Sequence, residues 1–232
     1  MDYAYADIAG MIDHALLAPN LTTEELETGC RLAREYEVAS VCVLPWAVKR
    51  ADELLSGTTV QPTTTVGFPH GGQATGVKAA EAEQALADGA TELDMVVNIS
   101  KVKSADWDYV REDIAAVLEP TPRKRTKLKV IFETCYLAEA EEIRLCEICG
   151  ELGVDWVKTS TGFGAGGATD EDLILMKTHS PAYVQVKASG GIRDLDRLLR
   201  VRELGCTRCG ASGTKDILDE LKRRLAGGDG KD

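Results

Sequence analysis

The chain has 232 residues, of which 44% are hydrophobic but only 5% aromatic, so Ala, Val, Leu and Ile must fill most of its core. This composition excludes a disordered chain, a collagen-like protein and a disulfide scaffold. The 27 basic and 38 acidic side chains give a net charge of −11, which disfavours nucleic acid and anionic membranes as partners. An anionic ligand would therefore need a local positive site.

Short segments rich in Val, Ile and Thr alternate with longer helical segments along the chain. Thr22 and Glu25 have the spacing of a capping box, and Gly89, Gly153 and Gly205 each follow a helical segment as C′ glycines do. The predicted helices are Thr22–Glu35, Thr75–Asp88, Asp106–Leu118, Ala138–Glu151, Asp170–Thr178 and Asp194–Glu203. The predicted strands are Met11–Leu16, Val38–Val43, Thr63–Gly67, Glu92–Val97, Leu128–Glu133, Trp156–Thr159, Tyr183–Lys187 and Thr207–Gly210.

This alternation predicts right-handed βαβ units and a parallel sheet. Eight such units fit an α/β fold of the (β/α)8 TIM-barrel type, which commonly has about 250 residues. The alternative is a doubly wound open sheet, which usually has a glycine-rich first turn, whereas here the first strand leads into Ala15-Leu16-Leu17-Ala18-Pro19. No linker divides the chain, so we expect a single barrel domain over residues 1–226 and a flexible tail over 227–232.

The seven cysteines favour a reducing, cytoplasmic location, because their number is odd and no signal peptide precedes them. Two CxxC pairs are separated by 56 residues, whereas a zinc ribbon needs roughly 15–20. Cys146 and Cys149 are instead expected to pack on one helix face as small apolar groups. The three histidines include no HExxH pair, so we predict no metal and no cofactor.

The basic run Arg123-Lys124-Arg125-Thr126-Lys127 is short, lacks aromatic residues and follows two prolines. We interpret it as a solvated loop before a strand rather than as a nucleic-acid patch. No apolar stretch approaches the roughly 18 residues that span a membrane. The sequence therefore gives no support for nucleic acid or a membrane as a partner.

Several predicted strands alternate apolar and polar residues, although strands of a wound parallel sheet are normally apolar on both faces. In Leu128–Glu133 Lys129 and Glu133 share one face, and in Tyr183–Lys187 Gln185 and Lys187 do so, because residues two apart point the same way. The apolar face must pack on the helices, so the charged face should point into the barrel. A buried ion-pair network that only stabilises the fold would not explain why charges cluster at strand ends, where barrel enzymes hold their active sites.

Four candidates lie late in their strands or at their ends: Asp13, Asp94, Lys158 and Lys187. Desolvation and a second cation both lower the pKa of a lysine, and a neutral amine can form a Schiff base with a carbonyl compound. A nearby carboxylate can then move protons. These residue types predict covalent amine catalysis on an aldehyde or ketone.

Glycine-rich turns follow three of the predicted strands. Thr161-Gly162-Phe163-Gly164 follows the sixth, Ser189-Gly190-Gly191-Ile192-Arg193 the seventh, and Gly210-Ala211-Ser212-Gly213-Thr214 the eighth, where it opens a helix. Barrel enzymes often bind phosphate there through backbone N–H groups and a helix N-terminus. Together with the lysine pair, these turns predict a Schiff-base enzyme acting on a phosphorylated carbonyl compound.

These segments resemble the deoxyribose-phosphate aldolase family from about residue 8 to about residue 220, in the order found in that family. The motifs around Lys158 and Lys187 are the most specific. The matching segments are Ile12-Asp13-His14, Val41-Cys42-Val43, Val66-Gly67-Phe68-Pro69-His70-Gly71, Glu92-Leu93-Asp94-Met95-Val96-Val97-Asn98, Glu133-Thr134-Cys135, Val157-Lys158-Thr159-Ser160-Thr161-Gly162-Phe163, Lys187-Ala188-Ser189-Gly190-Gly191-Ile192-Arg193 and Arg208-Cys209-Gly210-Ala211-Ser212.

The resemblance implies a class I aldolase that needs no metal and that reversibly cleaves 2-deoxy-D-ribose 5-phosphate to D-glyceraldehyde 3-phosphate and acetaldehyde, in deoxyribose catabolism. Lys158 would form the Schiff base. Lys187 would perturb the pKa of Lys158 and bridge to Asp94. Asp94 would relay protons through a water, and Asp13 would belong to the same network. The phosphate would be held by Thr161, Gly162, Gly190, Gly191, Arg193, Gly210 and Ser212. Homo-oligomers, dimers or tetramers, are common in the family.

The sequence departs from the family pattern at a few positions. Ala15 replaces the usual Thr, Leu44 replaces a frequent Asn, and no Tyr follows Ala226 to assist proton transfer. Cys42 can be interpreted either as a small core residue or as a reactive thiol. His70, Lys78 and Glu81 also match the family, and the three-residue spacing of Lys78 and Glu81 on a helix predicts a structural ion pair.

Two alternative functions remain open at this point. The first is a Schiff-base aldolase for another sugar phosphate. The second is a catalytically silent barrel that binds a phosphate or sugar, which the glycine turns alone would suit. A pure binding protein has no need of a second lysine, so the pair formed by Lys158 and Lys187 favours an enzyme.

Overall fold

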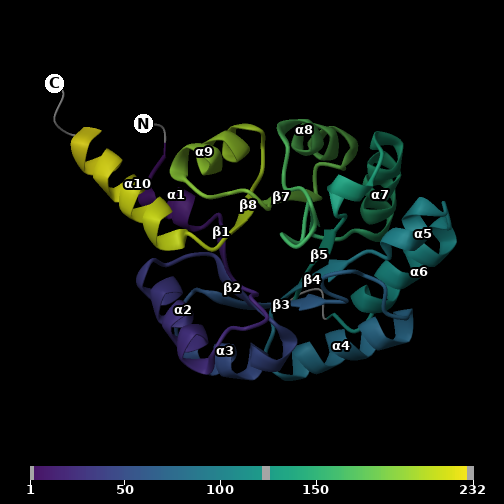
Figure 1. Cartoon of the computed structure of the whole chain (residues 1–232), viewed down its shortest axis with the longest axis horizontal. Coiled ribbons are helices and arrows are strands. Elements are labelled where there is room, and N and C mark those ends of the chain that lie inside the picture. The colour runs from purple at the N-terminus through teal and green to yellow at the C-terminus, as the bar shows by residue number, and fades with distance from the viewer. Residues whose placement is uncertain (1–2, 122–125, 229–232) are drawn as a thin grey trace.

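A computed structural model describes residues 3–121 and 126–228 of the chain. Eight parallel strands close into a barrel in which each strand pairs with the next and β8 pairs with β1. The helices surround this barrel (Figure 1), which confirms the predicted (β/α)8 fold and excludes the doubly wound sheet. The strands are β1 (Ile12–Leu16), β2 (Ser40–Val43), β3 (Gln61–Val66), β4 (Glu92–Val96), β5 (Lys127–Ile131), β6 (Trp156–Lys158), β7 (Gln185–Ser189) and β8 (Arg208–Ala211).

All six predicted helices are confirmed to within one residue at each end. The prediction missed three helices of five to eight residues, α1, α3 and α5, which are too short to carry a strong periodic signal. The helices are α1 (Tyr5–Ala9), α2 (Thr23–Glu35), α3 (Val48–Leu55), α4 (Thr75–Ala87), α5 (Ile99–Lys103), α6 (Trp107–Leu118), α7 (Glu139–Leu152), α8 (Asp170–His179), α9 (Leu195–Glu203) and α10 (Thr214–Gly228), with 3-10 turns η1 (Pro45–Ala47) and η2 (Thr134–Tyr136).

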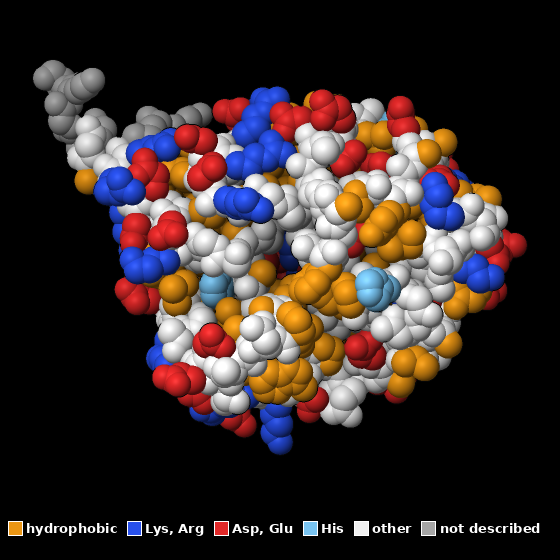
Figure 2. Space-filling model, viewed as in Figure 1, with side chains coloured by type: hydrophobic (Ala, Val, Ile, Leu, Met, Phe, Trp, Pro, Cys, Tyr) orange, Lys and Arg blue, Asp and Glu red, His pale blue; other side chains and the backbone are white. Residues whose placement is uncertain are grey.

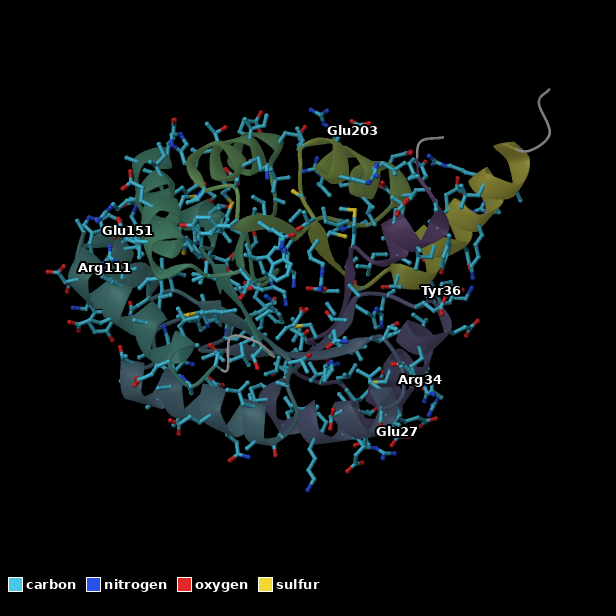
Figure 3. All side chains as sticks on the ribbon, turned by 180° about the vertical axis from the view of Figure 1, so that it is seen from behind. Glu27, Arg34, Tyr36, Arg111, Glu151 and Glu203 are labelled. Carbon is cyan, nitrogen blue, oxygen red and sulfur yellow. The ribbon has the colours of Figure 1, made fainter. Side chains whose placement is uncertain are left out.

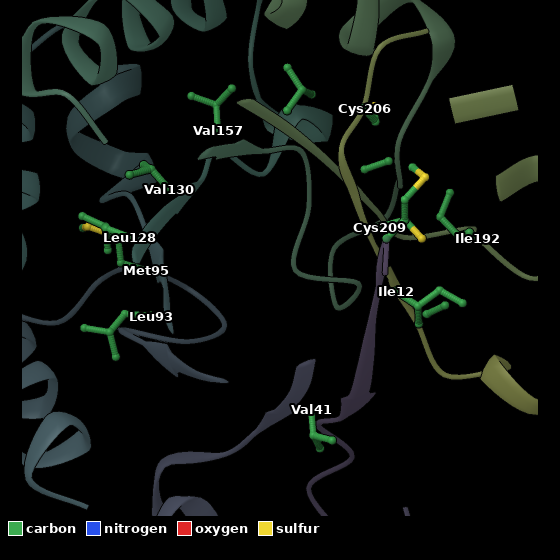
Figure 4. Close-up of a cluster of buried hydrophobic side chains, with 14 of the residues drawn as sticks. Ile12, Val41, Leu93, Met95, Leu128, Val130, Val157, Ile192, Cys206 and Cys209 are labelled. Carbon is green, nitrogen blue, oxygen red and sulfur yellow. The ribbon is translucent and has the colours of Figure 1, made fainter. Parts of the chain in front are cut away.

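The hydrophobic core lies between the outer face of the barrel and the helices. Figure 4 shows Leu93, Met95, Leu128 and Val130, which project from neighbouring strands β4 and β5 and are completely buried. Cys146 and Cys149 of α7 belong to the same core, which confirms that they pack as small apolar groups. Burial raises the pKa of Cys146 to about 12, so its thiol stays protonated.

The outer rim of the helices carries exposed charged side chains. In Figure 3 the labelled side chains of Arg111 and Glu151 lie at the rim, where they form an ion pair between α6 and α7. Glu27 of α2 similarly pairs with Arg50 of α3 at 2.7 Å. Such exposed pairs contribute about 0–1 kcal/mol each to the free energy of unfolding. Their main effect is to keep the surface polar.

Parts of two predictions lie outside the described residues: Arg123-Lys124-Arg125 of the basic run, and residues 229–232 of the tail. The first two tail residues, Gly227 and Gly228, belong to α10, which packs against α1. Within residues 3–121 and 126–228, no helix combines the length and the apolar character needed to cross a membrane.

Candidate active site

A pocket of about 380 Å³ opens at the carboxyl ends of the strands, where the loops after β1, β6, β7 and β8 meet. In the view down the barrel (Figure 2), this face is hollowed near its centre, and hydrophobic side chains gather beside the hollow. The volume suits a small molecule, and this end of a (β/α)8 barrel is where active sites lie. The lining residues that the sequence singles out are Asp13, Lys158, Thr161, Gly162, Lys187, Gly190, Gly191, Arg193, Gly210 and Ser212.

Asp94 is the centre of the charged network beneath this pocket. Its Oδ2 accepts hydrogen bonds from Lys158 Nζ and Lys187 Nζ, both at 2.7 Å, and its Oδ1 accepts one from Lys129 Nζ at 2.8 Å. Asp94 is completely buried beneath the pocket, and the two lysines connect it to that space. The charged faces of β4, β6 and β7 therefore point into the barrel, as the alternation in the sequence predicts.

Asp13 on β1 completes the network from the opposite side of the barrel. It forms ion pairs with Lys187 and with Arg208 of β8, and its Oδ2 lies 3.6 Å from Lys129 Nζ. Glu92 on β4 binds Arg208 at 2.7 Å and also pairs with Lys129. The structure thus brings together all four predicted catalytic candidates.

The prediction missed Lys129, Glu92 and Arg208 as members of this network. Lys129 is completely buried, and Asp94 is its partner in the register of β4 and β5. The alternation in Leu128–Glu133 indicated that Lys129 faces inward, but its contacts depend on the pairing register of the barrel, which the sequence alone does not give.

The same contacts give the two pocket lysines opposite properties. Burial lowers the pKa of Lys158; Asp94 opposes this shift, and the charge of Lys187 adds to it. Burial alone would also lower the pKa of Lys187, but Asp13 and Asp94 raise it above its usual range. Burial would raise the pKa of Asp94, but Lys129, Lys158 and Lys187 hold it well below its usual range. The site therefore holds a carboxylate, a permanent ammonium and one lysine amine that loses its proton more readily.

Free backbone N–H groups surround the rest of the pocket. Among the described residues, the N–H groups of Gly162, Gly190, Gly191 and Ser212 donate to no hydrogen-bond partner. The three glycines have φ values of 86°, 83° and 84°, which a side chain would strain. The loop after β8 then leads into the N-terminus of the 15-residue helix α10. This arrangement can bind an anion.

The start of α10 is tied to β1 by His14, whose Nδ1 lies 2.8 Å from Thr214 Oγ1. Burial lowers the pKa of His14 to about 4, so the ring is neutral at pH 7. Cys42 also lines the pocket and is 2% exposed. Burial, together with Asp94, raises the pKa of Cys42 to about 11. Of its two interpretations, the geometry thus favours a protonated thiol in the pocket wall over a thiolate.

The predicted ion pair between Lys78 and Glu81 is wrong. Lys78 is completely buried and donates to Asp113 at 2.6 Å and to the carbonyl of Val96 at 2.9 Å. Glu81 instead accepts the N–H of Gly67 at 2.6 Å. Helical spacing alone brings the two residues to one face, but the Lys78 side chain turns inward beneath the end of β4.

The fold and the site together define a barrel enzyme with its reactive groups at the carboxyl ends of the strands. A profile described as DeoC/LacD family aldolase matches residues 8–215. The chain belongs to this family of aldolases, which are carbon–carbon lyases.

Named relatives and solved structures agree with this assignment. The chain is 58% identical to the deoxyribose-phosphate aldolase of Rhodopirellula baltica, over 97% of this chain and 93% of that one. It is 48% identical to the enzyme of the same name from Caldanaerobacter subterraneus, over 95% and 96% of the two chains. A tetrameric deoxyribose phosphate aldolase from Aeropyrum pernix superposes with a TM-score of 0.87 at 28% identity, over 94% and 92% of the two chains.

Proposed function

We propose that this chain reversibly cleaves 2-deoxy-D-ribose 5-phosphate to D-glyceraldehyde 3-phosphate and acetaldehyde through a Schiff base on Lys158. The names of its relatives, at 58% and 48% identity, support the substrate. The observation that carries the mechanism is the shared carboxylate: Lys158 and Lys187 both donate to Asp94 Oδ2 at 2.7 Å, at the floor of one pocket.

The unequal pairing of the two lysines supports Lys158 as the one that reacts. Among the described residues, Lys187 contacts two carboxylates, Asp13 and Asp94, whereas Lys158 contacts Asp94 alone. Lys187 therefore stays charged, while burial and the neighbouring ammonium favour the neutral amine of Lys158. Only the neutral amine can attack a carbonyl carbon, so Lys158 is the nucleophile.

In the cleaving direction, Lys158 Nζ adds to the aldehyde carbon of the open-chain sugar, and loss of water leaves an iminium. A base takes the proton of the C3 hydroxyl, the C2–C3 bond breaks, and its electron pair forms the enamine as glyceraldehyde 3-phosphate leaves. Protonation at C2 and addition of water then release acetaldehyde and the free amine.

Asp94 suits the proton transfers of this cycle because it remains ionised. When Lys158 becomes an iminium, its Nζ keeps a single N–H, so its contact with Asp94 Oδ2 can loosen while Lys187 still donates to that oxygen. A lone pair of Asp94 Oδ2 can then accept a proton through a bridging water. Asp13 takes no direct part in this scheme, since its contacts with Lys187 and Arg208 keep the ammonium of Lys187 in place.

The phosphate end of the substrate binds at the glycine turns. The N–H groups of Gly162, Gly190, Gly191 and Ser212 and the N-terminus of α10 provide donors, and Arg193 provides a positive charge at the pocket wall. Thr161 and Gly210 complete the wall around them. Local donors of this kind can hold an anion even though the whole chain carries a charge of −11.

Borohydride trapping in the presence of acetaldehyde tests the assignment. Peptide mapping should find the added group on Lys158, and Lys158→Ala should abolish both trapping and turnover. Trapping on a different lysine, or turnover by Lys158→Ala, would refute the covalent role. Parallel assays with deoxyribose 5-phosphate, fructose bisphosphate and keto-deoxy sugar acids separate this substrate from those of other Schiff-base aldolases.

We further propose that the chain forms a homo-oligomer and works in the cytoplasm. The named tetramer from Aeropyrum pernix supports oligomer formation, and the seven free thiols suit a reducing compartment. Light scattering of the purified protein would test the first proposal; a monomer at micromolar concentration would contradict it. Cell fractionation would test the second.

A further inference from the structure

Glu133, two residues beyond the end of β5, has an unusual backbone conformation for a buried residue. Its φ and ψ are 59° and 60°, in the left-handed region that residues other than glycine rarely adopt. Among the described residues, Glu37 and Ala105 also have positive φ, but both are exposed, whereas Glu133 is 2% exposed. A strained conformation of this kind persists only where the surrounding contacts enforce it.

The carboxylate of Glu133 is buried without a cation. Within the described part of the chain, it forms no ion pair with Lys, Arg or His. Its two oxygens instead accept both donors of one residue: Oε1 accepts the N–H of Thr161 at 3.2 Å, and Oε2 accepts its hydroxyl. Burial of a carboxylate is costly unless such bonds are made, so both donors of Thr161 are committed to Glu133.

The bonds continue from Thr161 along the turn that follows β6. Thr161 Oγ1 accepts the N–H of Phe163 at 3.0 Å. The N–H of Gly162, which lies between them, has no partner among the described residues. The hydroxyl of Thr161 thus donates to Glu133 and accepts from Phe163, and these bonds fix the turn on either side of the one free N–H.

The turn held in this way forms one wall of the active-site pocket. Thr161, Gly162 and Phe163 all line that pocket. The ring of Phe163 packs edge-on against Phe68, with 5.4 Å between the ring centroids. The following loop also packs closely on the carboxylate, since a Cβ added to Gly164 would lie 3.1 Å from Glu133 Oε1.

We propose that Glu133 is a positioning residue for the phosphate end of the substrate, which it serves by holding Thr161 so that the N–H of Gly162 stays free for the phosphate. This inference rests on the proposed function. A carboxylate this close to an anion site would otherwise weaken binding by repulsion. The two hydrogen bonds that Glu133 accepts from Thr161 partly offset the charge of the carboxylate. They also hold Thr161 firmly, because a charged acceptor forms stronger bonds than a neutral one.

The experiment compares Glu133→Gln with Glu37→Gln, the same substitution at an exposed residue that also has positive φ. For Glu133→Gln we expect KM for deoxyribose 5-phosphate to rise roughly tenfold, which corresponds to the loss of one hydrogen bond to a charged group. The kinetic constants for unphosphorylated deoxyribose and the trapping of Lys158 should stay unchanged. Glu37→Gln should change none of these quantities.

Thr161→Val removes the hydroxyl from the other side of the same contact and provides a second variant if Glu133→Gln does not fold. It should raise the same KM, and the double variant should be no worse than the more affected single one, because both act through one contact. An equal KM increase for both substrates, or additive effects, would overturn the proposal.

Calorimetric titration with inorganic phosphate separates this proposal from the proposed function. Phosphate should bind the wild-type protein more tightly than Glu133→Gln whether or not deoxyribose 5-phosphate is turned over. If the wild type binds phosphate but does not turn the sugar over, the proposed function fails while this inference stands. Equal phosphate affinity in both proteins would overturn the role of Glu133.

Discussion

The charge of Lys187 should help to keep Lys158 neutral, and Lys187→Met tests this directly. Both Nζ atoms lie 2.7 Å from Asp94 Oδ2, so their separation is at most twice that distance, about 5.4 Å. At an effective dielectric constant of about 20, two unit charges about 5 Å apart interact by about 3 kcal/mol, or about two pKa units. Removing Lys187 also leaves Asp94 with one cation fewer, which raises the pKa of Lys158 further.

We therefore expect the acid limb of kcat/KM against pH to move upward by about one to two units in Lys187→Met. Turnover at pH 7 should fall about 10- to 100-fold and recover in part at higher pH. Lys103→Met, which removes an exposed lysine of α5 paired with Glu141, is the matched control and should leave the profile in place. Circular dichroism checks that each variant is folded.

A loss of activity at every pH with an unmoved acid limb would refute this reasoning. It would show that burial alone, the largest cause of the lowered pKa of Lys158, is sufficient. A downward shift would contradict the electrostatic argument altogether, because removal of a neighbouring cation can only favour protonation of Lys158.

Three further predictions concern stability, each measured by urea unfolding. Lys129→Met should cost about 3–5 kcal/mol, because Asp94 and Glu92 then lose a buried cation; a cost below about 1 kcal/mol would contradict this. Burial and the charges of Asp172, Glu139 and Glu141 raise the pKa of Glu142 to about 8. The folded chain therefore holds a proton that the unfolded chain releases near the ordinary pKa of Glu. The free energy of unfolding should fall by about 2–4 kcal/mol as the pH rises from about 5 to 8. Glu142→Gln should flatten this fall, and an unchanged slope would contradict the assignment. Gly190→Ala should destabilise the fold more than Gly162→Ala, although the two φ values are nearly equal, 83° and 86°. A Cβ added at Gly190 would lie 2.8 Å from Gly167 Cα, whereas one added at Gly162 would have no atom within 4 Å. Equal losses of unfolding free energy would show that backbone strain alone sets the cost.

The eight strands could be predicted from sequence because helix, glycine and strand recur regularly, but their exact ends could not. β7 was predicted at Tyr183–Lys187 and is observed at Gln185–Ser189. Tyr183 is 64% exposed and lies in a turn that is closed by a bond from Val184 N–H to the Pro181 carbonyl. The strand instead continues to Ser189, which is paired with Gly210 of β8. Tertiary pairing outweighed the local preference of Tyr for a strand.

The same limit applies to the site. Periodicity could indicate that Asp94, Lys158 and Lys187 point into the barrel, and their residue types could indicate amine chemistry. It could not indicate which lysine gives up its proton, because that depends on the pairing of Asp13 with Lys187 across the closed barrel. Contacts of this kind exist only once the first and seventh strands have been brought together by the fold.

Charge balance explains why Lys158 is the group that can be neutral. The buried network contains four cations and three carboxylates, namely Lys129, Lys158, Lys187 and Arg208 with Asp13, Glu92 and Asp94. Fully ionised, it carries one positive charge in excess, and buried excess charge is costly. Loss of the proton from Lys158, which has a single carboxylate partner in the described part of the chain, makes the network neutral. In the proposed reaction, formation of the iminium on Lys158 would restore the positive charge while the anionic substrate is bound, so that the charge would arise at the stage where it favours binding.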